Sequence, residues 1–149
     1  MPALPAPSLP AVALAAAVGL AVGIGGYTFV YAKGGAYLGD DPNACAQCHV
    51  MQVYLDSWQN SPHQHVAVCN DCHTPSNPIS KYYVKATNGF HHSTAFTSGN
   101  YPTNIRARES SQRVVEGQCR HCHADVVQAM VGNDESASCV RCHRTVGHL

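Results

Sequence analysis

The sequence predicts a mainly α protein, with a single N-terminal transmembrane helix followed by a small domain that has little regular secondary structure. Two observations support this fold class. A long apolar segment without charged side chains begins the chain, and the segments after it are short and interrupted by proline. No stretch shows the alternating pattern of a β-strand of useful length. We expect an N-terminal tail at 1–10, the transmembrane helix at 11–32 and the outer domain at 33–149.

Every cysteine of the chain belongs to one of four copies of a short motif. The 8 cysteines form pairs with two residues between them, and each pair is followed directly by a histidine. Two such thiols can bond the two vinyl groups of a haem while the adjacent histidine reaches the iron. The motifs therefore predict four covalently bound c-type haems and a tetrahaem cytochrome c domain. The attachment residues are Cys45, Cys48, Cys69, Cys72, Cys119, Cys122, Cys139 and Cys142.

Zinc ribbons and disulfides also use paired cysteines. Neither requires a histidine after every pair, so we prefer haem. A zinc-binding interaction module remains an alternative, and a red protein with the sharp absorbance of reduced haem would exclude it.

The formal net charge is +0 with histidine neutral, which indicates no basic face for nucleic acid. The propionates of four haems would add up to about eight negative charges. A nucleic-acid partner is therefore disfavoured.

Residues 11–32 are long and apolar enough to cross a bilayer as a helix. Tyr27, Phe29 and Tyr31 lie where an interfacial aromatic belt is expected. A cleaved signal peptide is the alternative, but no Lys or Arg precedes the segment and it exceeds a usual signal core. We prefer a retained anchor. In the main rival interpretation, a soluble periplasmic electron carrier, N-terminal sequencing of the mature protein would find the segment removed.

Ala15, Gly19 and Gly23 recur at four-residue intervals, a pattern that is compatible with helix–helix contact in the membrane and equally with a plain anchor. Covalent haem attachment takes place outside the cytoplasm. We therefore expect a single-pass protein of the inner (plasma) membrane with its haem domain on the periplasmic side.

The outer domain is expected to contain two dihaem units, at about 45–73 and 119–148, because the motifs group in pairs along the chain. The positions of proline between them predict short helices near 49–59, 79–97 and 110–131. Haem, rather than side chains, is expected to make up most of the core.

Each haem iron has two axial positions, and the motif histidines can fill one position each. In the first motif a second candidate, Met51, follows two residues after His49. A thioether ligand raises the haem potential compared with a second histidine, which suits a haem that accepts electrons first. Filling a gap beside the haem is an equal alternative for Met51. The histidines outside the motifs are His63, His65, His91, His92, His121 and His148.

Several local patterns together resemble one family. These are the methionine after the first motif, Trp58 to His63 as W-x-x-S-x-H, Lys85 followed by Gly89, and the C-H-R-T-V-G-H ending at His148. The chain resembles the NapC/NirT family of membrane-anchored tetrahaem cytochromes over nearly its whole length. It is most similar to the branch that oxidises menaquinol and feeds NrfA, the pentahaem catalytic subunit of cytochrome c nitrite reductase.

The resemblance implies a menaquinol dehydrogenase that draws on the membrane quinone pool, works in a hetero-oligomer and does not itself reduce nitrite. A quinol dehydrogenase for another periplasmic reductase is the second alternative. The resemblance also implies that a lysine of the partner completes the second haem, and that His148 and His63 are distal ligands of the third and fourth haems. The other implied iron ligands are Met51, in place of His49, and the proximal His73, His123 and His143.

Lys85, Asn88 and His92 are spaced so that they share one face of a helix. Menaquinol must lose two protons and two electrons, so its site needs a proton acceptor. We expect His92, with an ordinary pKa near 6.5, to accept a proton while Lys85 orients the quinol oxygen. A solvated helix face is the alternative. One branch of the family has Asp in the place of His92, so whether His92 contacts iron is left open.

Overall fold

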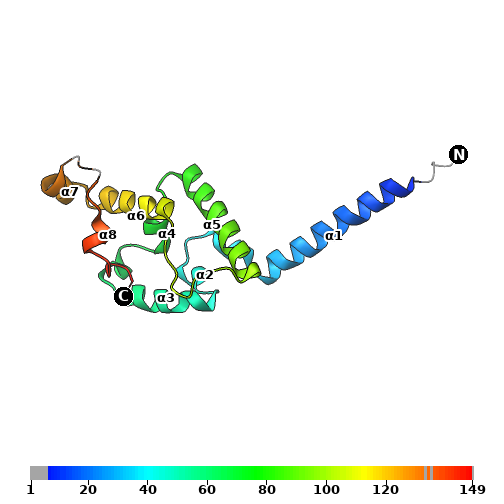
Figure 1. The fold of residues 1–149 in the computed structure, drawn as a ribbon, viewed down its shortest axis with the longest axis horizontal. Helices are drawn as coiled ribbons and strands as arrows, with labels where there is room; N and C mark the ends of the chain where they lie inside the picture. Colours follow the sequence, from blue (N-terminus) through cyan, green and yellow to red (C-terminus); the bar gives the residue numbers. More distant parts are fainter. Residues whose placement is uncertain (1–6, 133, 135, 149) are drawn as a thin grey trace. The chain divides into compact units, whose positions relative to one another are not determined.

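The computed structural model describes residues 7–132, 134 and 136–148. Helices dominate this part of the chain, and none of its residues lies in a β-strand, which confirms the mainly α fold class (Figure 1). Most of the predicted tail, residues 1–6, lies outside the described residues.

The first helix, α1, spans Leu9–Tyr31 and has a mean hydropathy of 2.0. A proline in its first turn is favourable because its missing N–H is not needed there. None of its residues is buried within the protein, and the helix is long and apolar enough to cross a membrane. Its bounds fall within two residues of the predicted span 11–32.

The chain divides into two compact units, Met1–Gly39 and Asp40–Leu149. The first unit holds α1 and a short 3-10 helix, η1, at Gly34–Leu38. The second unit carries all four cysteine motifs. Its elements are α2 (Pro42–Cys45), η2 (His49–Met51), α3 (Gln52–Gln59), η3 (Pro62–His65), α4 (Cys69–His73), α5 (Pro78–Ser98), α6 (Glu109–Cys122), α7 (Ala124–Val131) and α8 (Cys139–Cys142).

The predicted helices of the outer domain are all present, and two of them are divided. The segment 49–59 forms η2 and α3, and 79–97 forms most of α5. The segment 110–131 is two helices, because the backbone leaves the helical region at His123, with φ −105° and ψ 29°. This break coincides with the histidine of the third motif.

The longest helix of the second unit, α5, has clear signals at both ends. The Asn77 side chain accepts hydrogen bonds from the backbone N–H groups of Ile79 (3.0 Å) and Ser80 (3.2 Å), which is a strong N-cap. Gly99 ends the helix with φ 67°, in the left-handed region that glycine adopts readily. Helix α5 thus offers a rigid platform of 21 residues for the side chains on its faces.

Very few side chains are buried in the described residues. The buried apolar side chains are Ala44 and Leu55, and the buried polar one is Thr74. A domain of this length normally buries a contiguous apolar core. Polar contacts join α4 to α6 instead: Gln118 Nε2 donates to the Thr74 carbonyl at 2.8 Å. The second unit therefore needs another apolar body in its interior, as four haems would provide.

Candidate functional site

The cysteine pairs lie on or beside helical turns. Helix α4 is the second motif itself, α8 covers the fourth pair, and α6 ends on the third pair. Residues three positions apart share a helix face, so the two thiols of each of these pairs point to the same side. In the first motif, Cys45 ends α2 and Cys48 precedes η2. No disulfide joins any of these cysteines, so every thiol can form a thioether.

The first and second motifs meet at their leading cysteines. A hydrogen bond with the Cys69 thiol lowers the pKa of Cys45 to about 7, and the same contact raises the pKa of Cys69. The charge of Lys85 also lowers the pKa of Cys45. These shifts concern the thiols before haem attachment, but the proximity that causes them persists. Lys85 therefore lies near the first haem motif.

The second, third and fourth motifs also lie next to one another in the order of the chain. Burial raises the pKa of Cys72, and the nearby thiol of Cys122 acts in the same direction, so the second and third motifs are neighbours. Burial also raises the pKa of Cys139, and Cys119 adds to this rise, which makes the third and fourth motifs neighbours. The motifs form a continuous series from the first to the fourth, as a relay of electrons requires.

Two spare histidines face two motif histidines. The ring centroids of His73 and His148 are 5.8 Å apart, and those of His63 and His123 are 6.2 Å apart. With metal–nitrogen bonds of about 2 Å, two imidazoles on opposite sides of one metal have centroids about 6 Å apart. The spacing fits an iron between the rings of each pair.

The same two spare histidines carry buried polar atoms without partners. Nδ1 of His63 and Nδ1 of His148 are buried and make no hydrogen bond to a described residue. Buried polar atoms are normally satisfied, so each of these rings suits a further group. Burial also lowers the pKa of His148, which favours the neutral imidazole that binds metals. The residues of both pairs therefore fit haem.

This pairing differs from the one that the resemblance implied. We expected His148 and His63 to serve the third and fourth haems. In the structure His148 lies beside His73 of the second motif, and His63 lies beside His123 of the third. The difference arises because α6 packs on α4 and the chain end returns toward Tyr54, whose ring lies 5.3 Å from the His148 ring.

The remaining candidate ligands have no spare histidine facing them among the described ring contacts. His49 and His143 are exposed, as His73 and His123 are, and Met51 is partly buried. Their roles stay predictions. No group of three or more His, Cys, Asp or Glu side chains among the described residues could hold a metal ion. A haem iron needs no such group because the porphyrin supplies four of its ligands.

Lys85 is held in a polar cluster that the sequence did not reveal. Asp40 Oδ2 lies 2.7 Å from Lys81 Nζ, and its Oδ1 lies 3.1 Å from Lys85 Nζ. Asn70 Nδ2 donates to the same carboxylate at 2.7 Å. The hydrogen bond from Lys81 is the largest cause that lowers the pKa of Asp40 to about 2, and Lys85 and Asn70 add to it. Because Asn70 belongs to the second motif, the cluster ties α5 to the haem region.

The other two residues of the predicted quinol face, Asn88 and His92, lie near Arg108. Arg108 Nη2 donates to Asn88 Oδ1 at 3.1 Å. Partial desolvation lowers the pKa of His92, and the positive charges of Arg108 and His91 act in the same direction. His92 is therefore neutral at neutral pH and able to accept a proton. The three predicted residues share one helix but are anchored at two places, Lys85 at Asp40 and Asn88 at Arg108.

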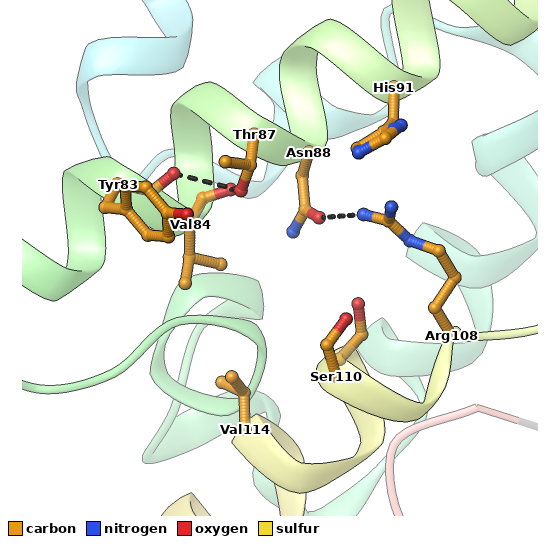
Figure 2. A pocket seen from close by; sticks show the side chains of 9 residues that line it. Tyr83, Val84, Thr87, Asn88, His91, Arg108, Ser110 and Val114 are labelled. Atoms are coloured by element: carbon orange, nitrogen blue, oxygen red, sulfur yellow. Dashed lines mark hydrogen bonds between the residues drawn. The ribbon is translucent and has the colours of Figure 1, made fainter.

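A hollow of about 280 Å³ opens between α5 and the start of α6 (Figure 2). Asn88 is the one residue of the predicted quinol face that lines it. No acidic side chain is among the lining residues, which are Tyr83, Val84, Thr87, Asn88, His91, Arg108, Ser110, Ser111 and Val114. The hollow lies beside the predicted face and meets it at Asn88.

Residues 8–149 match the model of the NapC/NirT cytochrome c family, N-terminal region. The chain belongs to this family. Cytochrome c-type protein NrfH of Wolinella succinogenes is 37% identical over 142 residues, which cover 87% of this chain and 80% of that protein. Cytochrome c nitrite reductase subunit NrfH of Nitratidesulfovibrio vulgaris is 30% identical over 105 residues, which cover 70% of this chain and 65% of that protein.

A crystal structure of the cytochrome c nitrite reductase NrfHA complex bound to the HQNO inhibitor has the same fold, with a TM-score of 0.67. The matched chain is 29% identical, and the match covers 93% of this chain and 90% of that chain. Membership of the NapC/NirT family, which the sequence motifs predicted, is thus confirmed. Membership of this cytochrome c family supports covalently bound haem, which agrees with the ring spacings and the scarcity of a side-chain core.

Sequence reasoning missed Asp40 and Arg108. Asp40 lies 41 and 45 positions before its lysine partners, and Arg108 lies 20 positions after Asn88. No local period connects residues so far apart. The signal that could have found Asp40 is its place between the last apolar residues and the first motif, at the start of the haem unit.

Proposed function

We propose that this chain is the quinol-oxidising, electron-donating subunit of a cytochrome c nitrite reductase. Menaquinol would be its substrate, and an NrfA-like pentahaem subunit would be its partner. The NrfH relatives and the likeness to the NrfHA complex support this proposal. The helix Leu9–Tyr31 would anchor the chain in the inner membrane, with the haem unit on the periplasmic side.

The observation that carries the proposal is the place of Lys85. Lys85 lies on the rigid helix α5, and its positive charge lowers the pKa of Cys45 in the first motif. Its ammonium group is bound by Asp40. A cation that is fixed beside the first haem motif can orient a quinol oxygen and stabilise the anion that forms when the hydroxyl loses its proton. The first haem would then be the electron acceptor.

Four haems would be bound by the cysteine pairs, and each bound haem would supply the chemistry of accepting and passing on single electrons. Met51 would ligate the first iron in place of His49. The ring spacings support His73 with His148 for the second iron and His123 with His63 for the third. His143 would ligate the fourth iron.

We propose contact with the partner at the fourth motif, where the resemblance implied the second. His143 has no ring contact with another histidine among the described residues. We therefore place the ligand from the partner, a lysine, at the fourth haem instead of the second. The series of adjacent motifs would then carry electrons from the quinol at the first haem to the partner at the fourth.

Side chains of this protein would accept the protons that quinol oxidation releases. Oxidation of one quinol to quinone releases two electrons and two protons. Neutral His92 would accept one proton, release it to solvent through its exposed edge, and then accept the second. Asn88, held by Arg108, would keep the quinol ring oriented toward Lys85.

The test is steady-state menaquinol oxidation by Lys85→Ala and His92→Ala variants with full haem content. We expect turnover to fall at least about tenfold in each. Lys81→Ala is the matched control, because Lys81 binds the same carboxylate but, unlike Lys85, does not lower the pKa of Cys45. Unchanged turnover in both Lys85→Ala and His92→Ala would refute the proposed site.

A second candidate function is donation to another periplasmic reductase. Its support is the match to cytochrome c-type protein TorY of Escherichia coli O157:H7, 24% identical over 160 residues that cover 87% of this chain and 43% of TorY. Purification of the native protein distinguishes the two. Isolation without a pentahaem nitrite reductase would favour the second candidate.

A further inference from the structure

One face of α5 consists of large apolar and aromatic side chains that are half exposed or more. Ile79 is 84% exposed, Tyr83 70%, Phe90 69% and Tyr82 50%. At about 100° per residue these four positions fall within an arc of about 100°. We call them the outer face of α5. Lys81, Lys85, Asn88 and His92 fall on the opposite side of the helix.

The outer face differs in kind from the other sides of α5. Lys81 and Lys85 are bound to Asp40, and the side toward α6 forms the hollow with Arg108. The outer face is at least half exposed, although Tyr82 lies beside Lys85 and Tyr83 borders the hollow. Four large apolar and aromatic residues on one helix face indicate an interaction surface.

The short segment between α1 and Asp40 indicates that a membrane surface can contact the outer face of α5. Helix α1 ends at Tyr31, and Asp40, nine residues later, is bonded to Lys81 at 2.7 Å and to Lys85 at 3.1 Å. Nine residues span at most about 30 Å when fully extended. With α1 in a bilayer, Asp40 is thus confined to within about 30 Å of the membrane surface, and the first half of α5 is bound to Asp40 through two lysine side chains.

The composition of α5 also suits a lipid headgroup region. Its 21 residues include no Asp or Glu that anionic lipid would repel. Tyrosine favours membrane interfaces because its ring is apolar and its hydroxyl is polar. Helices that lie in the interface present such an apolar face to the acyl chains and keep polar side chains on the opposite face.

We propose that α5 lies on the membrane surface, with Ile79, Tyr82, Tyr83 and Phe90 seated at the boundary between lipid headgroups and acyl chains. Tyr83 belongs both to this outer face and to the lining of the hollow. The hollow therefore opens at the lipid boundary and continues around α5 to Asn88 (Figure 2). This membrane contact rests on the anchor of the proposed function, and it gives a quinol dissolved in the bilayer a path through the hollow to Asn88.

The direct test is labelling by lipid. The full-length haem-loaded chain is placed in nanodiscs of phosphatidylethanolamine and phosphatidylglycerol that contain a lipid with a diazirine in its acyl chain. After illumination and digestion, we expect at least about fivefold more lipid adducts on the α5 peptide than on the α7 peptide, whose Val126 and Met130 are also exposed. Equal labelling of α5 and α7, or none on α5, would overturn the proposal.

A variant test follows from the same surface. Ile79→Ser with Phe90→Ser removes apolar area from the outer face and touches none of the proposed ligands or quinol residues. We expect the adducts on α5 to fall, and the apparent KM for membrane-dissolved menaquinol to rise about fivefold, while reduction by dithionite is unchanged. Val126→Ser with Met130→Ser is the control, and an equal rise in KM there would contradict the proposal.

The proposed membrane contact of α5, which we call its seating, and the proposed quinol site can be refuted independently. If Lys85→Ala leaves quinol turnover intact while α5 is still labelled by lipid, the quinol site is wrong and the seating stands. If Lys85 is required but α5 takes no label, the seating alone is wrong. Loss of the label on α5 when the reductase partner is added would show that the outer face binds that partner, which also overturns the seating.

Discussion

Asp40 and Lys85 form an ion pair, with Oδ1 3.1 Å from Nζ, although 45 positions separate them in the chain. The lysine is nearly covered, with 13% of its side chain exposed, while the aspartate side chain is 46% exposed. A long lysine side chain has many rotamers, and a fixed partner selects one of them. We infer that Asp40 positions the Lys85 ammonium group beside the first haem motif.

Asp40→Asn is therefore expected to lower menaquinol turnover about fivefold while all four haems remain attached. The loss should appear in kcat more than in KM if the misplaced ammonium acts on the reacting oxygen. Asp40→Glu, which keeps the charge, should restore part of the activity. Asp41→Asn is the matched control, because Asp41 caps α2 by accepting from the Asn43 N–H at 2.9 Å, and asparagine can also cap. Equal losses at both positions would argue against a positioning role.

The same carboxylate gives a prediction for acid stability. Its pKa is about 2 in the folded protein and 3.8 in its ordinary state, so the lowered value stabilises the fold. This contribution is complete above about pH 4 and is lost as the pH falls toward 2. Because Asp40 is largely exposed, we expect it to be worth less than about 1 kcal/mol. Denaturant unfolding of the native chain and Asp40→Asn should differ at pH 6 and converge near pH 2, and a difference that grows in acid would contradict this assignment.

The sequence predicted the parts of this protein that depend on neighbouring residues. Motif spacing indicated the haem attachment sites, and the positions of proline predicted a helix near 79–97, where α5 spans Pro78–Ser98. The break of the 110–131 segment at His123 was not predicted, because the residues on both sides favour helix. The contacts of Asp40 and Arg108, and the facing rings of His63 and His123, join distant segments. Such pairings depend on how the helices pack, about which a local pattern carries no information.

Spectroscopy can test the ligand pairs directly. His148→Ala and His63→Ala should each convert one low-spin haem to a high-spin haem, because each removes a strong nitrogen ligand from one iron. Electron paramagnetic resonance of the oxidised protein would count the high-spin signals. The controls are His65→Ala and His121→Ala, which are exposed and should leave the spectrum unchanged. A spectrum that is unaltered in His148→Ala or His63→Ala would remove that residue from the ligand set.

The fourth motif depends on one carboxylate of α6. Glu116 accepts hydrogen bonds from Ser138 Oγ at 2.6 Å, Cys139 N at 2.8 Å and Val140 N at 3.2 Å. Burial opposes ionisation of Glu116, but these hydrogen bonds outweigh burial and lower its pKa. The carboxylate thereby caps α8 and fixes Cys139 for haem attachment.

Glu116→Gln is expected to weaken this cap and to cost about 1–2 kcal/mol of stability. Because an amide offers one acceptor oxygen where the carboxylate offers two, α8 should fray and the fourth haem should be attached less completely. Mass spectrometry of the intact chain would report the loss as a population with three haems instead of four. Glu109→Gln is the control, because Glu109 pairs with Arg113 on the exposed surface of α6. Full haem content in Glu116→Gln would mean that the packing of α8, rather than its cap, positions the last motif.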